Sequence, residues 1–73
     1  MLRSKIKKLL EQKEAELKMN LSNNYKDLAR EALNSFSDTL EQCFLDGEIK
    51  EKDYLKWKDK VNQYTISMKD YHH

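Results

Sequence analysis

A single glycine and no proline stand in this chain of 73 residues. The glycine, Gly47, lies within residues 44–54 (FLDGEIKEKDY), where one apolar helical pattern ends and a second begins. Strands need turns, and turns need Gly, Pro, Asn or Asp at set positions. Because the two strongest turn formers are almost missing, the sequence predicts an all-α protein. Its expected form is a helical hairpin folded at Gly47 and preceded by an N-terminal helix.

The segment 25–45 carries the broadest apolar face of the chain. Its apolar residues recur every three to four positions, as they do along one side of an α-helix. Gly47 follows at the position where helices often end with a positive φ, which costs glycine nothing. We predict a helix over 25–45, with Leu28, Phe36 and Leu40 in the core. The whole face comprises Tyr25, Leu28, Ala29, Ala32, Leu33, Phe36, Leu40, Cys43 and Phe44.

A further helix is predicted over 51–70, where apolar residues alternate at steps of three and four. This is the a/d spacing of helices that pack side by side. Ile49 and Tyr54 are five positions apart, which suits a hydrophobic staple around Lys50 as the N-cap. Two acidic residues in the first turn lie near the positive end of the helix dipole. The seam comprises Tyr54, Trp57, Val61, Tyr64, Met68 and Tyr71.

The first helix is predicted over 2–19, with an apolar stripe that polar residues interrupt in the middle. Residues 20–24 (NLSNN) form the predicted joint, because Ser and Asn compete with helical backbone bonds and favour caps. Asn24 is the predicted N-cap of the next helix. The apolar register continues across this joint, so one long helix from Leu2 to Leu45 is the alternative. The first helix either completes a three-helix bundle or is contributed to a dimeric helical bundle.

The hairpin segment contains a helix, then Gly47-x-Ile49, an acidic-plus-aromatic start at Asp53-Tyr54, and a basic helix. Over residues 40–64 this pattern resembles the SHOCT-type short helical hairpins. The chain departs from that family at Lys50, where such modules usually place Ser or Thr as the cap. The resemblance implies a role in association and names no partner.

Small size limits the core of this chain. Ordering a residue costs roughly 1.5 kcal/mol, whereas burying a large apolar side chain returns about 1.5–3 kcal/mol. With one cysteine and no cluster of metal ligands, neither a disulfide nor a metal ion is expected to stabilise the fold from within. Small scaffolds in this position often self-associate, so a homodimer is predicted.

Apolar residues outside the seam indicate where intermolecular contacts would form. At ~100° per residue, Leu55 and Ile66 fall together on the side of their helix opposite the seam. The incomplete stripe of the first helix offers a second surface at Leu2, Ile6 and Leu9. We predict these residues as a protein interface. The simpler interpretation is that isolated exposed apolar residues need no partner.

The function predicted from these features is that of a small, non-enzymatic, cytoplasmic interaction or regulatory protein that binds other proteins or itself through helix faces. An inhibitor, an adaptor or an immunity-type binder fits this description. The alternative is a dimeric nucleic-acid-binding accessory protein that uses Lys52, Lys56 and Lys60 on the outer face of the third helix. Against that alternative, the net charge is only +1.

Catalysis, cofactors and metal ions are not expected. Cys43 lies on the apolar face, where it is predicted to be a small core residue, and a nucleophile also needs an activating base. His72 and His73 end the chain and are weak metal ligands alone. Neither a glycine-rich phosphate loop nor a Cys/His metal spacing occurs. No signal peptide or membrane span is predicted, and the single cysteine suits a reducing, cytoplasmic setting.

Overall fold

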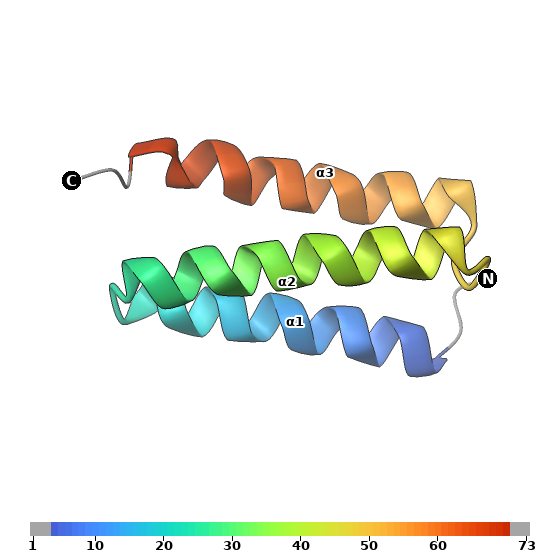
Figure 1. The fold of residues 1–73 in the computed structure, drawn as a ribbon, viewed down its shortest axis with the longest axis horizontal. Coiled ribbons are helices and arrows are strands. Elements are labelled where there is room, and N and C mark those ends of the chain that lie inside the picture. The colour runs from blue at the N-terminus through green and yellow to red at the C-terminus, as the bar shows by residue number, and fades with distance from the viewer. Residues whose placement is uncertain (1–3, 71–73) are drawn as a thin grey trace.

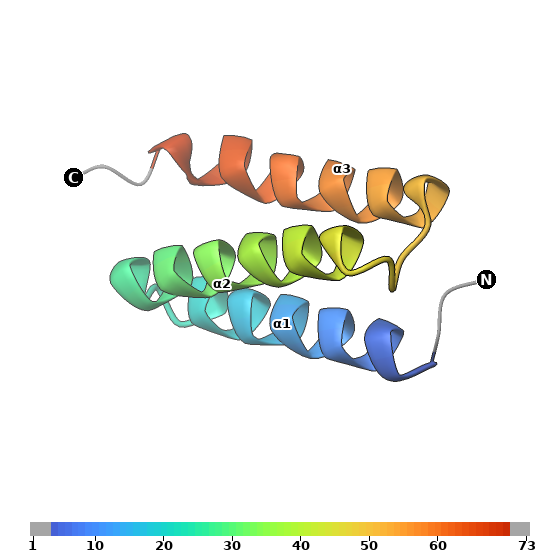
Figure 2. The same cartoon turned by 45° about the vertical axis from the view of Figure 1, so that its right-hand side comes forward.

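The computed structural model describes residues 4–70 as three α-helices followed by a short 3-10 turn. Helix α1 spans Ser4–Ser22, α2 spans Lys26–Leu45, α3 spans Glu51–Ser67, and η1 spans Met68–Asp70. The chain reverses twice, so that α2 lies between α1 and α3 and runs antiparallel to both (Figures 1 and 2). The predicted all-α class and three-helix bundle are confirmed. The alternative of one long helix through residue 45 is wrong.

Asn24 ends α1 and does not cap α2. Its backbone is left-handed, with φ of +62°. The N–H of Asn24 donates to the carbonyl of Leu21 at 3.1 Å, and the N–H of Tyr25 donates to the carbonyl of Asn20 at 2.9 Å. This pair of bonds is a Schellman motif, which satisfies the last carbonyls of a helix. The N-cap of α2 is Tyr25, which makes no side-chain cap bond, so the prediction for Asn24 is corrected.

Gly47 ends α2 in the same way and confirms the predicted turn. Its φ is +73°. The N–H of Gly47 donates to the carbonyl of Phe44 at 3.1 Å, and the N–H of Glu48 donates to the carbonyl of Cys43 at 2.9 Å. A positive φ is open to glycine because it has no Cβ. The two chain reversals therefore use one motif, with asparagine in one and glycine in the other.

The start of α3 matches the predicted staple. Lys50 is the N-cap, with extended backbone and no side-chain cap bond. Ile49, just before it, is buried, and Tyr54 packs against the core from the first turn of the helix. The Tyr54 ring also stacks on Phe44, with centroids 4.1 Å apart and planes 15° apart. Apolar contacts on both sides of Lys50 thus substitute for a polar cap.

The core is built mainly by α1 and α2, and Phe36 lies at its centre with no exposed surface. The rings of Trp57 and Tyr64 from α3 meet Phe36 edge-on, at centroid distances of 5.9 and 6.5 Å. Edge-to-face pairs of this kind add to the free energy of burial. The buried apolar residues are Ile6, Leu10, Leu17, Ala29, Ala32, Leu33, Phe36, Leu40, Cys43, Ile49 and Val61.

The predicted core face of α2 is broader than the buried one. Leu28, predicted as a core residue, is 50% exposed, and Tyr25 is 53% exposed. On a helical wheel Leu28 lies about 90° from the centre of the buried residues of α2. It also lies in the first turn of α2. The remaining predicted core positions, Phe36, Leu40, Ile49 and Val61, are buried, whereas Tyr54, Trp57 and Tyr64 are half-buried. The predicted positions Leu2 and Tyr71 lie outside the described residues, as do His72 and His73.

Candidate interaction surfaces

Leu55 and Ile66 lie exposed on the outer side of α3, as predicted. Their side chains are 56% and 59% exposed, and Val61, between them in sequence, faces the core. Eleven residues of helix separate them by about 16 Å. Asp59 and Asn62, both exposed, lie between them on the same side. The two residues, called here the outer α3 line, are therefore two separate contact points with a polar centre.

The predicted interface on the first helix is largely buried against α2 within the molecule. Ile6 is only 4% exposed and belongs to the core, so its prediction as an interface residue is wrong. The reason is that α2 packs along α1 and completes the stripe that looked unpartnered in the sequence. Leu9 is half-buried and packs against that core, and Leu2 lies outside the described residues. Of the three, only Leu9 retains an observed accessible edge.

A carboxylate from α1 holds α3 in place. The side chain of Glu14 is 13% exposed, and its Oε2 accepts a hydrogen bond of 2.8 Å from the Tyr64 hydroxyl. The Lys60 ammonium lies 3.5 Å from Oε1. Burial, together with the hydrogen bond to Glu14, raises the pKa of Tyr64 to about 12. Glu14, which interrupts the apolar stripe in the sequence, is thus the polar junction between α1 and α3.

A second carboxylate joins α2 to α3. Glu41 accepts hydrogen bonds of 2.7 and 2.9 Å from the Tyr54 hydroxyl and one of 2.9 Å from the Lys58 ammonium. The bond from Tyr54, with that from Lys58, lowers the pKa of Glu41. The same contacts raise the pKa of Tyr54 and of Lys58. These groups are therefore occupied in holding the helices together.

The three lysines predicted for nucleic-acid contact do not act alike. Lys52 and Lys56 are exposed on the outer face of α3. Lys60 instead turns toward α1, where it pairs with Glu14 and lies 5.0 Å from the centroid of the Trp57 ring. A cation over an indole face is electrostatically favourable. Lys60 also stays exposed, with 51% of its side chain accessible, but its ammonium is shared with Glu14, so only Lys52 and Lys56 of the predicted stripe point away from the bundle.

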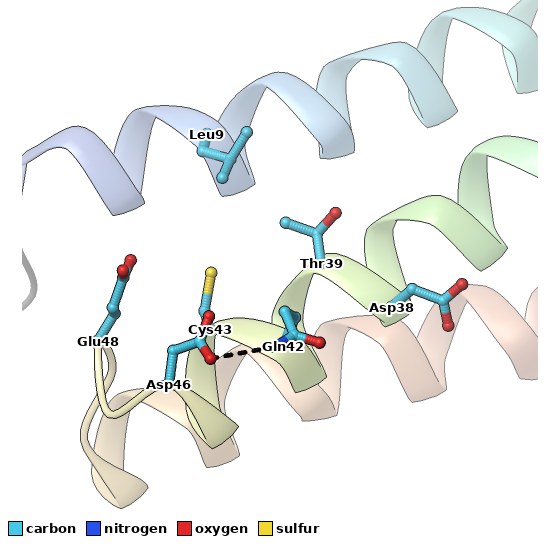
Figure 3. A pocket seen from close by; sticks show the side chains of 7 residues that line it. All are labelled: Leu9, Asp38, Thr39, Gln42, Cys43, Asp46 and Glu48. Carbon is cyan, nitrogen blue, oxygen red and sulfur yellow. Dashed lines mark hydrogen bonds between the residues drawn. The ribbon is translucent and has the colours of Figure 1, made fainter.

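An open groove of about 480 Å³ lies between α1 and the C-terminal half of α2. Leu9 lines it from α1, and Glu48 from the turn after α2 (Figure 3). Cys43 forms part of its floor and is 7% exposed, so the prediction that it is buried is confirmed. Burial, and then the charges of Glu48 and Asp46, raise the pKa of its thiol. The remaining lining residues are Asp38, Thr39 and Gln42 from α2 and Asp46 from its C-cap.

Sequence reasoning did not identify this groove. Its residues come from positions 9 and 38–48, which only the packing of α1 on α2 brings together. One local signal was present, since the segment 38–48 holds four of the acidic residues of the chain and no basic one. That signal indicates a negative surface but does not place Leu9 beside it.

Comparison of the chain with family models, with curated proteins and with solved structures finds no match. The resemblance to SHOCT-type hairpins therefore stays a prediction. Within residues 4–70, no helix is both long and apolar enough to cross a membrane. The same residues contain no group of three or more His, Cys, Asp or Glu side chains arranged to hold a metal ion.

Proposed function

We propose that this chain is a small non-enzymatic interaction or regulatory protein, which binds a protein partner, or a second copy of itself, through helix faces. An inhibitor, an adaptor or an immunity-type binder would act in this way. The observation that carries the proposal is the outer α3 line, since Leu55 and Ile66 are each more than half exposed. We also infer a cytoplasmic setting, because the one cysteine of the chain is a free thiol.

Burial of the outer α3 line is energetically worthwhile. Covering the exposed part of each side chain, 56% of Leu55 and 59% of Ile66, contributes about 1–2 kcal/mol, because full burial of a wholly exposed leucine or isoleucine contributes about 1.5–3 kcal/mol. The two residues therefore form two apolar contact points of a small interface. Exposed charges of both signs surround Leu55, from Glu51, Lys52, Lys56 and Asp59, and such a mixed rim sets the orientation of a partner more than its net charge. A partner with two apolar pockets spaced along one helix face therefore fits this surface.

A non-enzymatic role agrees with how the titratable side chains are occupied. Glu14 and Glu41 are held by tyrosine and lysine partners between the helices. The Cys43 thiol has a raised pKa, so it is mainly protonated and a poor nucleophile at neutral pH. These groups support structure, and none of them is poised near a second group that would activate it.

The test is affinity capture from a lysate of the native cell with and without nuclease, together with sedimentation of the purified chain. The variant Leu55→Glu/Ile66→Glu places charge on both contact points. Its matched control is Ser4→Glu/Gln12→Glu, which adds the same charge at exposed positions of α1, away from the outer α3 line, without removing an apolar side chain. A nuclease-resistant partner or a dimer that the first variant loses and the control keeps is expected. Equal binding by both variants, together with a wild-type monomer at high concentration, would contradict the proposal.

A nucleic-acid-binding accessory protein remains the second candidate, and the observation favouring it is the exposure of Lys52 and Lys56. Lysines that neutralise phosphates release counterions, so such binding weakens steeply as salt increases. Gel-shift assays at low ionic strength with duplex and single-stranded nucleic acid test this candidate. Salt-sensitive shifts lost in Lys52→Gln/Lys56→Gln are its expected result, and the absence of any shift removes it.

A further inference from the structure

The groove between α1 and α2 has an unbalanced charge. Three carboxylates line it, from Asp38, Asp46 and Glu48, and no cationic side chain of residues 4–70 does. Within the part of the chain that the structure describes, the carboxylates of Asp38 and Glu48 make no ion pair and no side-chain hydrogen bond. Asp46 accepts one bond, of 3.0 Å, from the Gln42 amide. The rim is therefore negative, and the described residues give its three carboxylates a single side-chain partner.

The floor of the groove is neutral and includes a buried thiol without a partner. Cys43 is 7% exposed, and its Sγ is directed toward α1 and the side chain of Leu9 (Figure 3). No hydrogen bond to this sulfur is found among the described residues. The charges of Glu48 and Asp46 contribute to the raised pKa of the thiol. The carboxylates of the rim therefore disfavour the thiolate form of Cys43, so the floor of the groove stays uncharged.

We propose that this groove binds a basic side chain, arginine or lysine, presented by a protein partner. Such a side chain joins an aliphatic stem to a charged head. The stem would lie over Leu9 and Cys43, while the head reaches the carboxylates of Glu48 and Asp46, the two whose charges act on the thiol. Asp38 lies at the opposite end of the groove (Figure 3), about 12 Å along the helix from residue 46, and adds to the negative charge there. Arginine suits this arrangement especially well, because its planar fork of donors pairs with two carboxylate oxygens. A groove of about 480 Å³ lies within the roughly 300–1,000 Å³ range of ligand sites.

This inference rests on the proposed function and adds to it, since it states what chemistry the partner carries. The groove contains no residue of α3, so it is a separate contact from the outer α3 line. A partner that used both surfaces would join an apolar contact to a charged one. Each surface can be removed without touching the other, which makes the two proposals separable.

The test is an NMR titration of the full-length, ¹⁵N-labelled chain with a hexa-arginine peptide blocked at both ends. A hexa-citrulline peptide is the control, because citrulline keeps the shape of arginine and lacks its charge. Saturable amide shifts concentrated in residues 38–48 and around Leu9 are expected with the first peptide and not with the second. Equal shifts with both peptides, shifts spread over all the acidic residues, or no shifts would overturn the proposal.

A pair of variants with equal charge change locates the binding. Asp38→Asn/Glu48→Gln removes two rim carboxylates that make no side-chain bond, and we expect the dissociation constant to rise about fivefold or more. Glu11→Gln/Glu31→Gln removes two exposed carboxylates outside the groove, and we expect a change of less than about twofold. Equal weakening by both variants would show general electrostatic attraction and would overturn the proposal that the groove is the binding site. A failure here alongside partner capture that depends on Leu55 and Ile66 would leave the proposed function standing.

Discussion

Two residues with left-handed backbone decide where this chain reverses. Asn24 and Gly47 each occupy the position just after a helix end, with φ of +62° and +73°. Asparagine is the side-chain-bearing residue that tolerates this conformation most readily, which is why it can stand where glycine otherwise would. The joint at residues 20–24 was predictable from its composition. The role of Asn24 was not, because asparagine is favoured both before a helix and after one.

Replacement of Asn24 tests the cost of this backbone conformation. We expect Asn24→Ala to lower the free energy of unfolding by up to about 1 kcal/mol, since the short polar side chain of asparagine can form local hydrogen bonds at positive φ and that of alanine cannot. Asn24→Gly should be neutral or slightly stabilising at the same position. Urea unfolding followed by circular dichroism measures both, with Asn23→Ala as the neighbouring control. Wild-type stability in Asn24→Ala would contradict the assignment of a left-handed cap.

Leu40 and Leu45 form a natural pair for testing the core. Both are leucines of α2, but Leu40 has no exposed surface and Leu45 is 77% exposed. We expect Leu40→Ala to cost roughly 2–5 kcal/mol, because it removes buried methyl groups and leaves a cavity. Leu45→Ala should change stability by less than about 0.5 kcal/mol. Equal melting of the two variants would mean that the buried face of α2 has been placed incorrectly.

At the scale of helices, α3 is held differently from the other two. It contributes one fully buried residue, Val61, whereas α1 and α2 supply most of the core. Its remaining attachments are half-buried aromatic rings and the hydrogen bonds to Glu14 and Glu41. Within residues 4–70, no Cα atom of α3 lies within 8 Å of one in α1. Helix α3 therefore depends on polar junctions that reach across the bundle, and it should be the first helix to open.

Hydrogen exchange measures this difference. Tyr64→Phe keeps the ring against Phe36 but leaves the nearly buried Glu14 without its hydroxyl donor. We expect the opening free energy of α3 amides to fall by roughly 1.5–3 kcal/mol, the range for a hydrogen bond to a charged group. The amides of α1 and α2 should change less.

Tyr54→Phe is the matched control for that experiment. It removes the same atom from a bond to Glu41, whose side chain is 41% exposed and can turn to water. A smaller effect on α3 is therefore expected from this variant. Uniform loss of protection in all three helices after Tyr64→Phe would show that the bundle opens as one unit.

A helix could be predicted from the sequence when its pattern was local, and a contact could not when its two residues lie far apart in the sequence. The apolar faces of α2 and α3 are local patterns, so their existence and approximate bounds could be predicted from spacing alone. The junction of Glu14 with Tyr64 spans 50 positions, and its register depends on how three helices settle against one another. In the sequence alone, polar residues within an apolar stripe, such as Lys13 and Glu14, therefore look like breaks in the buried face of the helix. In the folded chain Lys13 instead donates to Ser35 at 3.0 Å, across the α1–α2 interface.

At the scale of the whole molecule, charge and topology agree. Residues 21–48, which include α2, hold six acidic and two basic residues, and both flanking segments are net basic. Because α2 lies between α1 and α3 (Figure 2), each basic helix neighbours the acidic one. Exposed pairs contribute little individually, so this arrangement favours the observed order of helices without providing most of the stability. The acidic groove includes residues of α2 that the basic helices leave exposed.

The pH dependence of unfolding tests the two polar junctions together. The pKa of Glu41 is lowered below its ordinary value of 4.5, so its contribution is present above that pH and is lost as the pH falls through the folded-state value. The pKa of Tyr64 is raised from 10.0 to about 12, so its contribution is complete below pH 10 and is lost as the pH rises toward 12. The pKa of the Cys43 thiol is also raised, from an ordinary value of 9.0. Its contribution to stability is therefore also lost as the pH rises, and that loss begins at a lower pH than the loss from Tyr64.

We therefore expect a plateau of stability from about pH 5 to pH 9, with a decline on each side. Urea midpoints measured across this range by circular dichroism check the shape. Tyr64→Phe should flatten the decline above pH 10, because phenylalanine has no proton to lose, while Cys43→Ala should remove the part that begins near pH 9. The raised pKa values of Tyr54 and Lys58 leave a smaller alkaline decline in the combined variant. A decline as large as that of the wild-type chain would contradict the junction between Glu14 and Tyr64 as its main source.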